Sequence, residues 1–275
     1  MTDRYKRQIA LFGDAGQSRI SAAHVFQIGA GGLGMHTIQQ LAYLGIRRWT
    51  IADGDTVNIS NLNRLIGALS DDVGKPKVDI AARLIESVQP EAEIHVLPLM
   101  LPDESITRAI QTATVVIGAF DAELPRLMAI ETCSLSGVPY VDLATEIISV
   151  GDNEVIFGGR IVVASDGQGC PDCLGLIDQH ELAREQMPPE LQQIHDQQYG
   201  ISRHDLDGSG PSVISINGVV ASLAVTEVMC LLTGLRPPHR QLTYRGDLGA
   251  VHRNGACGRA GCSSCSRWRT THLAS

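Results

Sequence analysis

The stretch His24-Val-Phe-Gln-Ile-Gly-Ala-Gly-Gly-Leu-Gly34 decides the fold, because an apolar run typical of a buried strand passes directly into a glycine-rich turn. Residues 33–44 then have the spacing of an amphipathic helix. At such a turn the bare backbone can approach phosphate oxygens, and the helix N-terminus offers unpaired N–H groups. The turn therefore predicts a nucleotide site formed by Gly29, Gly31, Gly32 and Gly34. Tight packing of the helix on the strand would select the same glycines without a ligand.

The next apolar run ends in Asp53, and a polar loop follows it. Asp53 lies about twenty residues after the turn, where a carboxylate can accept the ribose hydroxyls. The loop places Asn58, Asn61, Asn63 and Arg64 beside the same site. Their amides and guanidinium group can orient a triphosphate, which an ordinary dinucleotide site does not require. The alternative is a solvated turn, in which asparagine is frequent because it tolerates turn geometry.

Apolar runs and helical patterns alternate through the rest of the first half of the chain. The expected elements are helices at 75–85, 103–111 and 123–136 and strands at 93–99, 114–118 and 140–144. This alternation predicts an α/β fold with a doubly wound, Rossmann-like, mostly parallel sheet. Two strand-like runs between 147 and 164, broken at Gly158-Gly159, predict an antiparallel extension of that sheet.

We expect one domain over residues 1–275, with a nucleotide-binding core at 1–146. Residues 147–275 would supply the antiparallel extension, a crossover segment, a late helix and a metal staple. The polar crossover segment at 178–210 predicts a loop or a short helix, and the three histidines in it have no metal-like spacing. Residues 212–233 predict a long apolar helix that packs on the sheet or on another subunit.

Two spaced cysteine pairs predict a structural zinc site: Cys170-Pro-Asp-Cys173 and Cys262-Ser-Ser-Cys265. Each pair can place two thiolates on one tight turn, and four thiolates complete the tetrahedral set that structural zinc prefers. The metal would then attach the end of the chain to its middle. Free thiols or a redox pair are the alternatives, and Cys257 is the substitute ligand if one of the four is misassigned.

The composition excludes several classes of partner. The chain has 275 residues, a net charge of −8 and only 4% aromatic residues, which argues against a surface that binds duplex or single-stranded nucleic acid. We read no apolar stretch as approaching the length of a membrane span, and no signal peptide at the N-terminus. A cytoplasmic protein without a membrane partner is therefore expected.

Several short motifs occur in one order along the chain, and this order is informative. They are Arg4-Tyr-Lys-Arg-Gln8, Gly29-Ala-Gly-Gly-Leu-Gly34, Asp53-Gly-Asp-Thr-Val57, Ser60-Asn-Leu-Asn-Arg64 and Gly74-Lys-Pro-Lys77. In this order the chain resembles the ThiF/MoeB/HesA family of ubiquitin-activating-enzyme-like adenylyltransferases. The resemblance covers roughly the first two-thirds of the chain and returns in the cysteine pairs and the late apolar helix.

The resemblance implies a role for each residue of an ATP site. Asp53 would bind the ribose beside Asp55, whereas Asn61, Arg64 and Lys77 would hold the phosphates of ATP. Asp121 would bind Mg²⁺, and Arg7 would reach the phosphates bound by the neighbouring subunit of a homodimer. Three of these residues also have a purely structural interpretation. Lys77 could be a surface lysine of a first helical turn, Arg7 a solvated arginine and Asp121 a helix cap.

The implied reaction is ATP- and Mg²⁺-dependent adenylylation of the C-terminal carboxylate of a small ubiquitin-like or sulfur-carrier protein. An acyl-adenylate and pyrophosphate would be formed, and a conjugating enzyme or a sulfur donor is the possible next partner. Asp121 is followed by Ala122 where relatives often have asparagine, and residues 205–213 lack the cysteine with which many relatives form a thioester. Because Cys133 and Cys230 lie on expected packing helices, we predict no obligatory internal thioester.

Three other functions stay open at this point. Within the same family, the substrate could be a peptide or a tRNA-linked carboxylate. An NAD-dependent oxidoreductase would share the glycine turn but would not require Arg64, Lys77 and Arg7 around the phosphates. A non-catalytic nucleotide-binding scaffold is the third alternative.

Overall fold

One continuous sheet organises the described part of the chain. The structure is a computed structural model that describes residues 2–150, 154–198, 211–255 and 257–268. Eight strands are ordered β3-β2-β1-β4-β5-β6-β7-β8 in it. The first five are parallel and the last three pair antiparallel, as expected. Their bounds are β1 His24–Ile28, β2 Arg48–Ala52, β3 Glu93–Leu97, β4 Val115–Gly118, β5 Tyr140–Val150, β6 Glu154–Ala164, β7 Gln241–Arg245 and β8 Ala250–Asn254.

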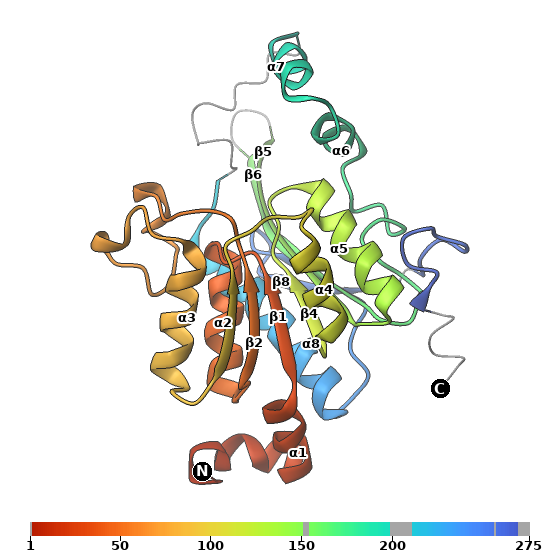
Figure 1. Ribbon diagram of the computed structural model, residues 1–275. Helices are drawn as coiled ribbons and strands as arrows, with labels where there is room; N and C mark the ends of the chain where they lie inside the picture. Colours follow the sequence, from red (N-terminus) through yellow and green to blue (C-terminus); the bar gives the residue numbers. More distant parts are fainter. Residues whose placement is uncertain (1, 151–153, 199–210, 256, 269–275) are drawn as a thin grey trace.

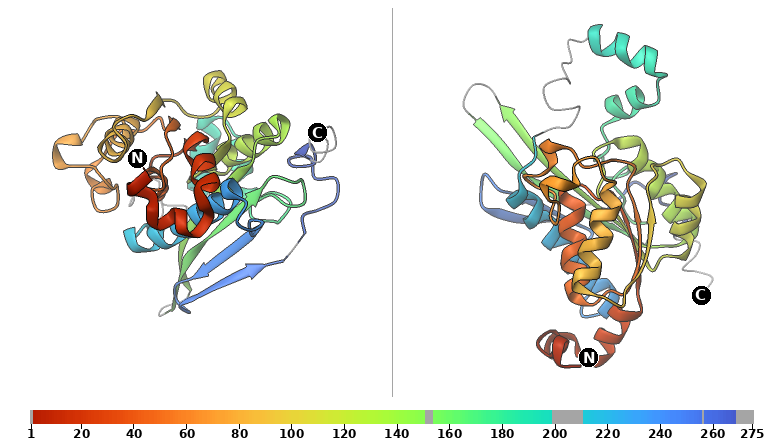
Figure 2. Two further views of the ribbon diagram at one scale, coloured as in Figure 1. Left: turned by 90° about the horizontal axis from the view of Figure 1, so that it is seen from below. Right: turned by 60° about the vertical axis from the view of Figure 1, so that its left-hand side comes forward.

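Helices cover both faces of the parallel part of the sheet (Figures 1 and 2). Alternate strand residues point to opposite faces, so Val115 and Ile117 lie in one buried core whereas Val116 lies in the other. The first core contains α2, α3 and α8, and the second contains α4 and α5. The bounds of these helices are α2 Gly32–Leu44, α3 Lys77–Val88, α4 Glu104–Thr112, α5 Glu123–Ser136 and α8 Ile214–Thr233.

An N-terminal helix, α1 (Thr2–Ala22), was not predicted as an element. Gly13 has a φ of 72° and kinks it. Tyr5 is buried and its hydroxyl bonds to the Gln89 amide at 2.5 Å. The Gln8 amide donates to the Leu44 carbonyl at 2.8 Å, at the end of α2. The motif at residues 4–8 therefore anchors α1 below the sheet (Figure 1).

The antiparallel extension is present, but its expected break is wrong. Gly158 and Gly159 lie inside β6, which runs unbroken to Ala164. A Cβ at Gly158 would lie 2.0 Å from the Tyr244 carbonyl oxygen, so this position requires the close approach of a neighbouring strand rather than a turn. β7 and β8 were not predicted, and β8 lies at the sheet edge with most of its residues exposed.

The crossover segment contains two helices, α6 (Gln179–Glu185) and α7 (Pro189–Gln198), which project above the sheet (Figure 1). The sequence predicted either a loop or a short helix for this segment. The part of it that the structure describes is mainly helical. His180 is exposed, whereas the side chain of His195 and all of His204 lie outside the described residues, as does the rest of the segment to residue 210.

The late apolar helix α8 is long enough to cross a membrane, so the expectation that no stretch approaches that length was wrong. Its most apolar window is 50% buried inside the fold, where it packs on α2 and on β5 and β6. This burial explains its apolar composition as that of a core helix. β5 spans residue 146 and joins the two expected halves in a single sheet, while their description as one domain stays a prediction.

Candidate active site

A cavity of about 820 Å³ opens at the carboxyl ends of the parallel strands. It lies where the strand order changes direction between β1 and β4, which is the usual ligand position in a doubly wound sheet. Most of the predicted site residues line it. They are Gly29, Gly31, Gly32, Asp53, Asp55, Asn61, Arg64, Lys77 and Asp121.

Glycine is required at different positions of the turn for different physical reasons. Gly29 has a φ of 88°, and a Cβ there would lie 2.4 Å from the Ala119 carbonyl oxygen. A Cβ on Gly34 would lie 1.9 Å from the Gly29 carbonyl oxygen, so this glycine serves packing alone and does not line the cavity. Nothing lies within 4 Å of the Cβ position of Gly31. Gly31 is also the N-cap of α2 and makes no side-chain cap, so its open space lies at a helix N-terminus suited to phosphate.

Asp53 is held by the backbone on both sides. Its two oxygens accept from the amides of Ala30 at 2.7 Å and Asp55 at 2.8 Å. Burial raises the pKa of Asp53, against the opposing charge of Lys77. The carboxylate is therefore fixed at the end of β2, within the cavity wall, where a ribose hydroxyl can donate to its remaining lone pairs.

Lys77 is directed into the site rather than into solvent. It begins α3, yet only 12% of its side chain is exposed. Its ammonium group lies 2.6 Å from Asp55. The alternative of a surface lysine is therefore wrong, because the charge is partly desolvated and paired inside the cavity wall.

Asn61 and Arg64 come from the loop around the short 3₁₀ helix η1 (Ile59–Asn61), and a second one, η2 (Ser70–Asp72), follows. The Asn61 side chain accepts from the Asn58 amide at 3.1 Å. Arg64 donates to the Ser60 carbonyl at 2.6 Å, and its Cγ would lie 3.0 Å from a Cβ on Gly32. The polar loop therefore brings the side chain of Arg64 to the N-terminus of α2, with its guanidinium group bonded to the loop itself.

Asp121 follows β4, is exposed, and lines the cavity. The helix-cap alternative for it is wrong, because the N-cap of α5 is Ala122. The carboxylate thus remains available to a cation in the cavity.

Sequence reasoning missed a buried ionic cluster behind this wall. Asp142 is fully buried and accepts from Arg126 at 2.6 Å, Arg160 at 2.5 Å and the Tyr140 hydroxyl at 2.9 Å. Burial alone would raise the pKa of Asp142, but the two guanidinium groups hold it below its ordinary value. Arg126 and Arg160 both line the cavity.

Arg7 does not lie at the site of its own chain. It is exposed on α1, and α1 lies at the end of the parallel strands where β1 begins, away from their carboxyl ends (Figure 1). It is not among the described residues that line the cavity.

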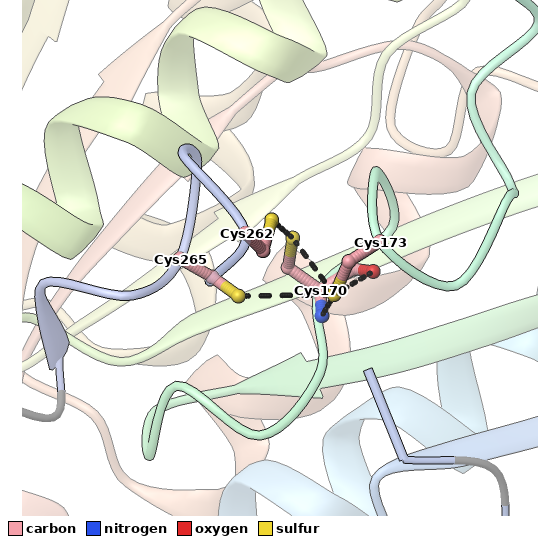
Figure 3. Close-up of side chains that lie close together, drawn as sticks. All are labelled: Cys170, Cys173, Cys262 and Cys265. Atoms are coloured by element: carbon pink, nitrogen blue, oxygen red, sulfur yellow. Dashed lines mark hydrogen bonds between the residues drawn. The ribbon is translucent and has the colours of Figure 1, made fainter. Parts of the chain in front are cut away.

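Four thiols form a second candidate centre (Figure 3). The sulfur atoms of Cys170, Cys173, Cys262 and Cys265 lie within 4.8 Å of one another and could hold a metal ion. Three of the separations are 3.7, 3.9 and 3.7 Å. A tetrahedron with Zn–S bonds of about 2.3 Å has edges of about 3.8 Å, so the arrangement fits zinc. Cys257 is exposed and lies outside this set.

The other two cysteines are buried packing residues, as expected. Cys133 lies on α5 and Cys230 on α8, and burial raises the pKa of each thiol. Neither lines the cavity described above.

A comparison with models of protein families shows to which family the chain belongs. Residues 5–254 match the model of the ThiF family. The chain belongs to the ThiF family. This ThiF-family chain is 30% identical over 267 residues to the sulfur carrier protein ThiS adenylyltransferase of Escherichia coli, covering 95% of this chain and 94% of that one.

Other relatives match a shorter part. The SAMP-activating enzyme E1 of Haloferax volcanii is 33% identical over 141 residues, which are 50% of this chain and 52% of the relative. The sulfur carrier protein adenylyltransferase of Thermus thermophilus gives the same identity and coverage. The ThiF-family chain thus spans about half the length of these two relatives.

Solved structures confirm the fold. Crystalline MccB of E. coli with AMPCPP and MccA superposes with a TM-score of 0.74 at 19% identity, covering 96% of this chain and 74% of MccB. PaaA superposes with a TM-score of 0.68 at 22% identity, covering 92% of this chain and 82% of PaaA. At these identities the likeness concerns the Rossmann-like architecture of the ThiF-family chain.

Proposed function

We propose that this ThiF-family chain is an ATP-dependent adenylyltransferase that acts on the C-terminal carboxylate of a small ubiquitin-like or sulfur-carrier protein. One observation carries the proposal: Arg64, Lys77 and Asp121, from three separate segments of the chain, line one cavity that includes the uncapped N-terminus of α2. Relatives named as sulfur-carrier and molybdopterin-synthase adenylyltransferases support this class of substrate. A cytoplasmic location goes with the proposal.

The chemistry requires charge stabilisation more than proton transfer. A carboxylate oxygen of the substrate attacks the α-phosphorus of ATP, a new O–P bond forms, and the bond to the bridging oxygen of the pyrophosphate breaks. The carboxylate is already ionised, so no general base is needed. Arg64 and Lys77 face the negative charge that grows on the phosphoryl oxygens and on the leaving pyrophosphate.

Two ions complete the proposal. Asp121 would hold Mg²⁺, which neutralises phosphate charge when bound, and its exposed carboxylate in the cavity wall fits that role. Zn²⁺ in the four-thiol centre would be structural, because four thiolates leave no open coordination position for chemistry.

The acyl group would pass directly to a partner, a thiol or a sulfur donor, without an obligatory internal thioester. The buried Cys133 and Cys230 support this, since neither thiol is accessible to a carrier tail. A non-reducing gel after incubation with ATP and the cognate carrier tests it. A reducible adduct that disappears in Cys257→Ala would contradict the proposal.

A homodimer is part of the proposed active form. Arg7 is exposed on α1 and does not line the cavity of its own chain. A second copy could therefore receive this guanidinium group at its phosphates, as the family resemblance implies.

A second candidate is adenylylation of a tRNA-linked carboxylate. One relative, the tRNA threonylcarbamoyladenosine dehydratase of E. coli, is 30% identical over 139 residues, 50% of this chain and 52% of that enzyme. The net charge of −8 counts against a tRNA surface. A peptide ending in a free carboxylate is the other substrate within this candidate.

Exchange of labelled pyrophosphate into ATP separates these functions. Exchange is expected with ATP, Mg²⁺ and one carrier protein, and Lys77→Ala should reduce it at least about 100-fold. Lys75→Ala is the matched control, because this neighbouring lysine is 53% exposed. Exchange only with a peptide, or only with a tRNA that carries a free carboxylate, would favour the second candidate. NADH turnover would indicate an oxidoreductase, and ATP binding without exchange would indicate a scaffold.

A further inference from the structure

The first turn of α5 lacks a cap of its own. Its N-cap residue is Ala122, which has no side-chain oxygen and makes no capping bond. The N–H groups of a first helical turn have no partner within the helix and need an acceptor from elsewhere. This turn directly follows Asp121, the residue proposed to hold Mg²⁺, so its order bears on the cavity.

The missing acceptor comes from the crossover segment. One carboxylate oxygen of Glu185 accepts from the Glu123 amide at 3.1 Å, and the other accepts from the Leu124 amide at 2.6 Å. Glu185 is the last residue of α6, about sixty residues further along the chain. A carboxylate at this position also interacts favourably with the positive end of the helix dipole.

Arg126 holds the other side of Asp121. Its guanidinium group donates to the Phe120 carbonyl at 2.8 Å while it is paired with the buried Asp142. Asp121 therefore lies between two restraints: Arg126, which holds the preceding residue, and Glu185, which comes from a distant helix and holds the first turn that follows. Arg126 is nearly fully buried. The hydrogen bonds of Glu185, in contrast, form only while α6 lies against the first turn of α5.

The helices α6 and α7 form one arm, which we call the crossover arm (residues 178–198). Arg184 on α6 pairs with Glu181 at 2.7 Å and with Asp196 on α7 at 3.4 Å. The Gln192 amide donates to the Met187 carbonyl at 2.8 Å. A displacement of the arm would thus carry Glu185 with it.

We propose that Glu185 is a positioning residue that makes the placement of Asp121 depend on docking of the crossover arm. It supplies from a distant helix the N-cap that Ala122 cannot supply locally. The part of this inference that concerns Mg²⁺ rests on the proposed function, whereas the capping of α5 does not. A substrate protein that contacts the arm would then change the metal affinity of the cavity.

Amide hydrogen exchange tests the capping directly. Glu185→Ala should accelerate exchange in the segment 123–126 about fivefold, the effect of losing a typical cap. A122N, which restores a preferred N-cap residue, should bring exchange back in the double variant. Unchanged exchange in Glu185→Ala, or no recovery in the double variant, would overturn the proposal.

The Mg²⁺ dependence of ATP binding, measured by calorimetry, tests the coupling to Asp121. Glu185→Ala should raise the Mg²⁺ concentration needed for half-maximal ATP binding about threefold, and A122N should reverse this. The exposed Glu190→Ala on α7 is the control and should change neither measurement. An unaltered Mg²⁺ dependence in Glu185→Ala would refute the coupling.

Two features keep the result decisive. Glu185→Gln retains the shape and one acceptor, so it should fold and show an intermediate acceleration even if Glu185→Ala does not fold. If the natural protein binds no ATP, the proposed function fails, while the exchange measurement still decides whether Glu185 caps α5.

Discussion

Gly31 and Gly34 are three residues apart in one motif, yet they answer different physical requirements. The space around the Gly31 Cβ position is open, whereas a Cβ on Gly34 would strike the Gly29 carbonyl oxygen. A motif read from sequence merges both requirements, since helix packing and phosphate approach select glycine alike. The structure separates them.

This difference predicts two outcomes for the same substitution. Gly31→Ala should fold with nearly natural stability but lose ATP affinity at least about tenfold, because the methyl group enters the phosphate position. Gly34→Ala should be destabilised by about 2 kcal/mol or more through the backbone clash. Thermal unfolding and calorimetric ATP titration of both variants check this. Natural ATP affinity in a folded Gly31→Ala protein would argue against a phosphate at this turn.

Individual residues of the site were predictable where a motif carried them. Asp53, Arg64, Lys77 and Asp121 all line the cavity. Asp142 was not predictable, because a single acidic residue in a strand gives no sign that two arginines from other elements will pair with it. The roles of the lining residues toward ATP remain predictions.

At the scale of elements, the contact between α2 and α8 contains a partly buried histidine. His36 Nε2 is buried without a hydrogen-bond partner, and the ring lies 3.2 Å from the Cβ position of Gly218. Burial lowers the pKa of His36, against a hydrogen bond with the Ile214 backbone. The native state therefore keeps this ring neutral at a pH where the unfolded chain already takes up a proton.

The sign of the pH effect follows from this lowered pKa. As the pH falls below about 6.5, the unfolded state binds the proton first, so the free energy of unfolding should decrease. His36→Leu should lose less stability between about pH 7 and about pH 5.5 than the natural protein. Denaturant unfolding at both pH values measures it, with the exposed His180→Leu as control. An equal loss of unfolding free energy between the two pH values in the natural protein and in His36→Leu would contradict the prediction.

The sequence predicted the buried elements with periodic apolar residues well, and it predicted the exposed elements poorly. The strand–helix units from β1 to β5 have clear apolar patterns, because both faces of the parallel sheet are covered. β8 is an exposed edge strand without such a pattern, and α1 is held by polar contacts at the end of α2 besides the burial of Tyr5 and Ile20. Hydrophobic periodicity alone cannot reveal either element.

At the scale of the whole molecule, the four-thiol centre joins the end of the chain to the loop after β6. Trp268 follows the second cysteine pair, is fully buried, and donates to the Val138 carbonyl at 3.0 Å. The metal would thus attach this tail to the region between α5 and β5.

Metal analysis should find one zinc ion per chain. Cys262→Ser should lose it and lower the melting temperature by about 5 °C or more, because the tail is then released. Cys257→Ser is the matched control and should keep both the zinc and the stability, since its thiol lies outside the cluster. Loss of zinc in Cys257→Ser with retention in Cys262→Ser would show that the ligand assignment is wrong.

Subunit complementation tests the role of Arg7 across a dimer. Arg7→Ala and Lys77→Ala should each be nearly inactive alone in pyrophosphate exchange. If Arg7 reaches the cavity of the second subunit, a mixed dimer contains one site with both natural residues, so re-equilibrated mixtures should recover about a quarter of the natural activity. No recovery despite subunit exchange would place both residues at the site of one chain, and natural activity of Arg7→Ala alone would show that Arg7 has no role.

The sequence by itself determined the α/β class, the parallel core, the four clustered thiols and nine of the residues that line the cavity, because short motifs and buried periodic runs carry local information. Only the tertiary structure decided that Asp142 pairs with Arg126 and Arg160, that Gly158 and Gly159 serve a close strand contact, and that Glu185 caps α5. The physical reason is the same in each case. These contacts join residues distant in sequence, and a lone carboxylate or glycine does not reveal the partner that folding brings to it.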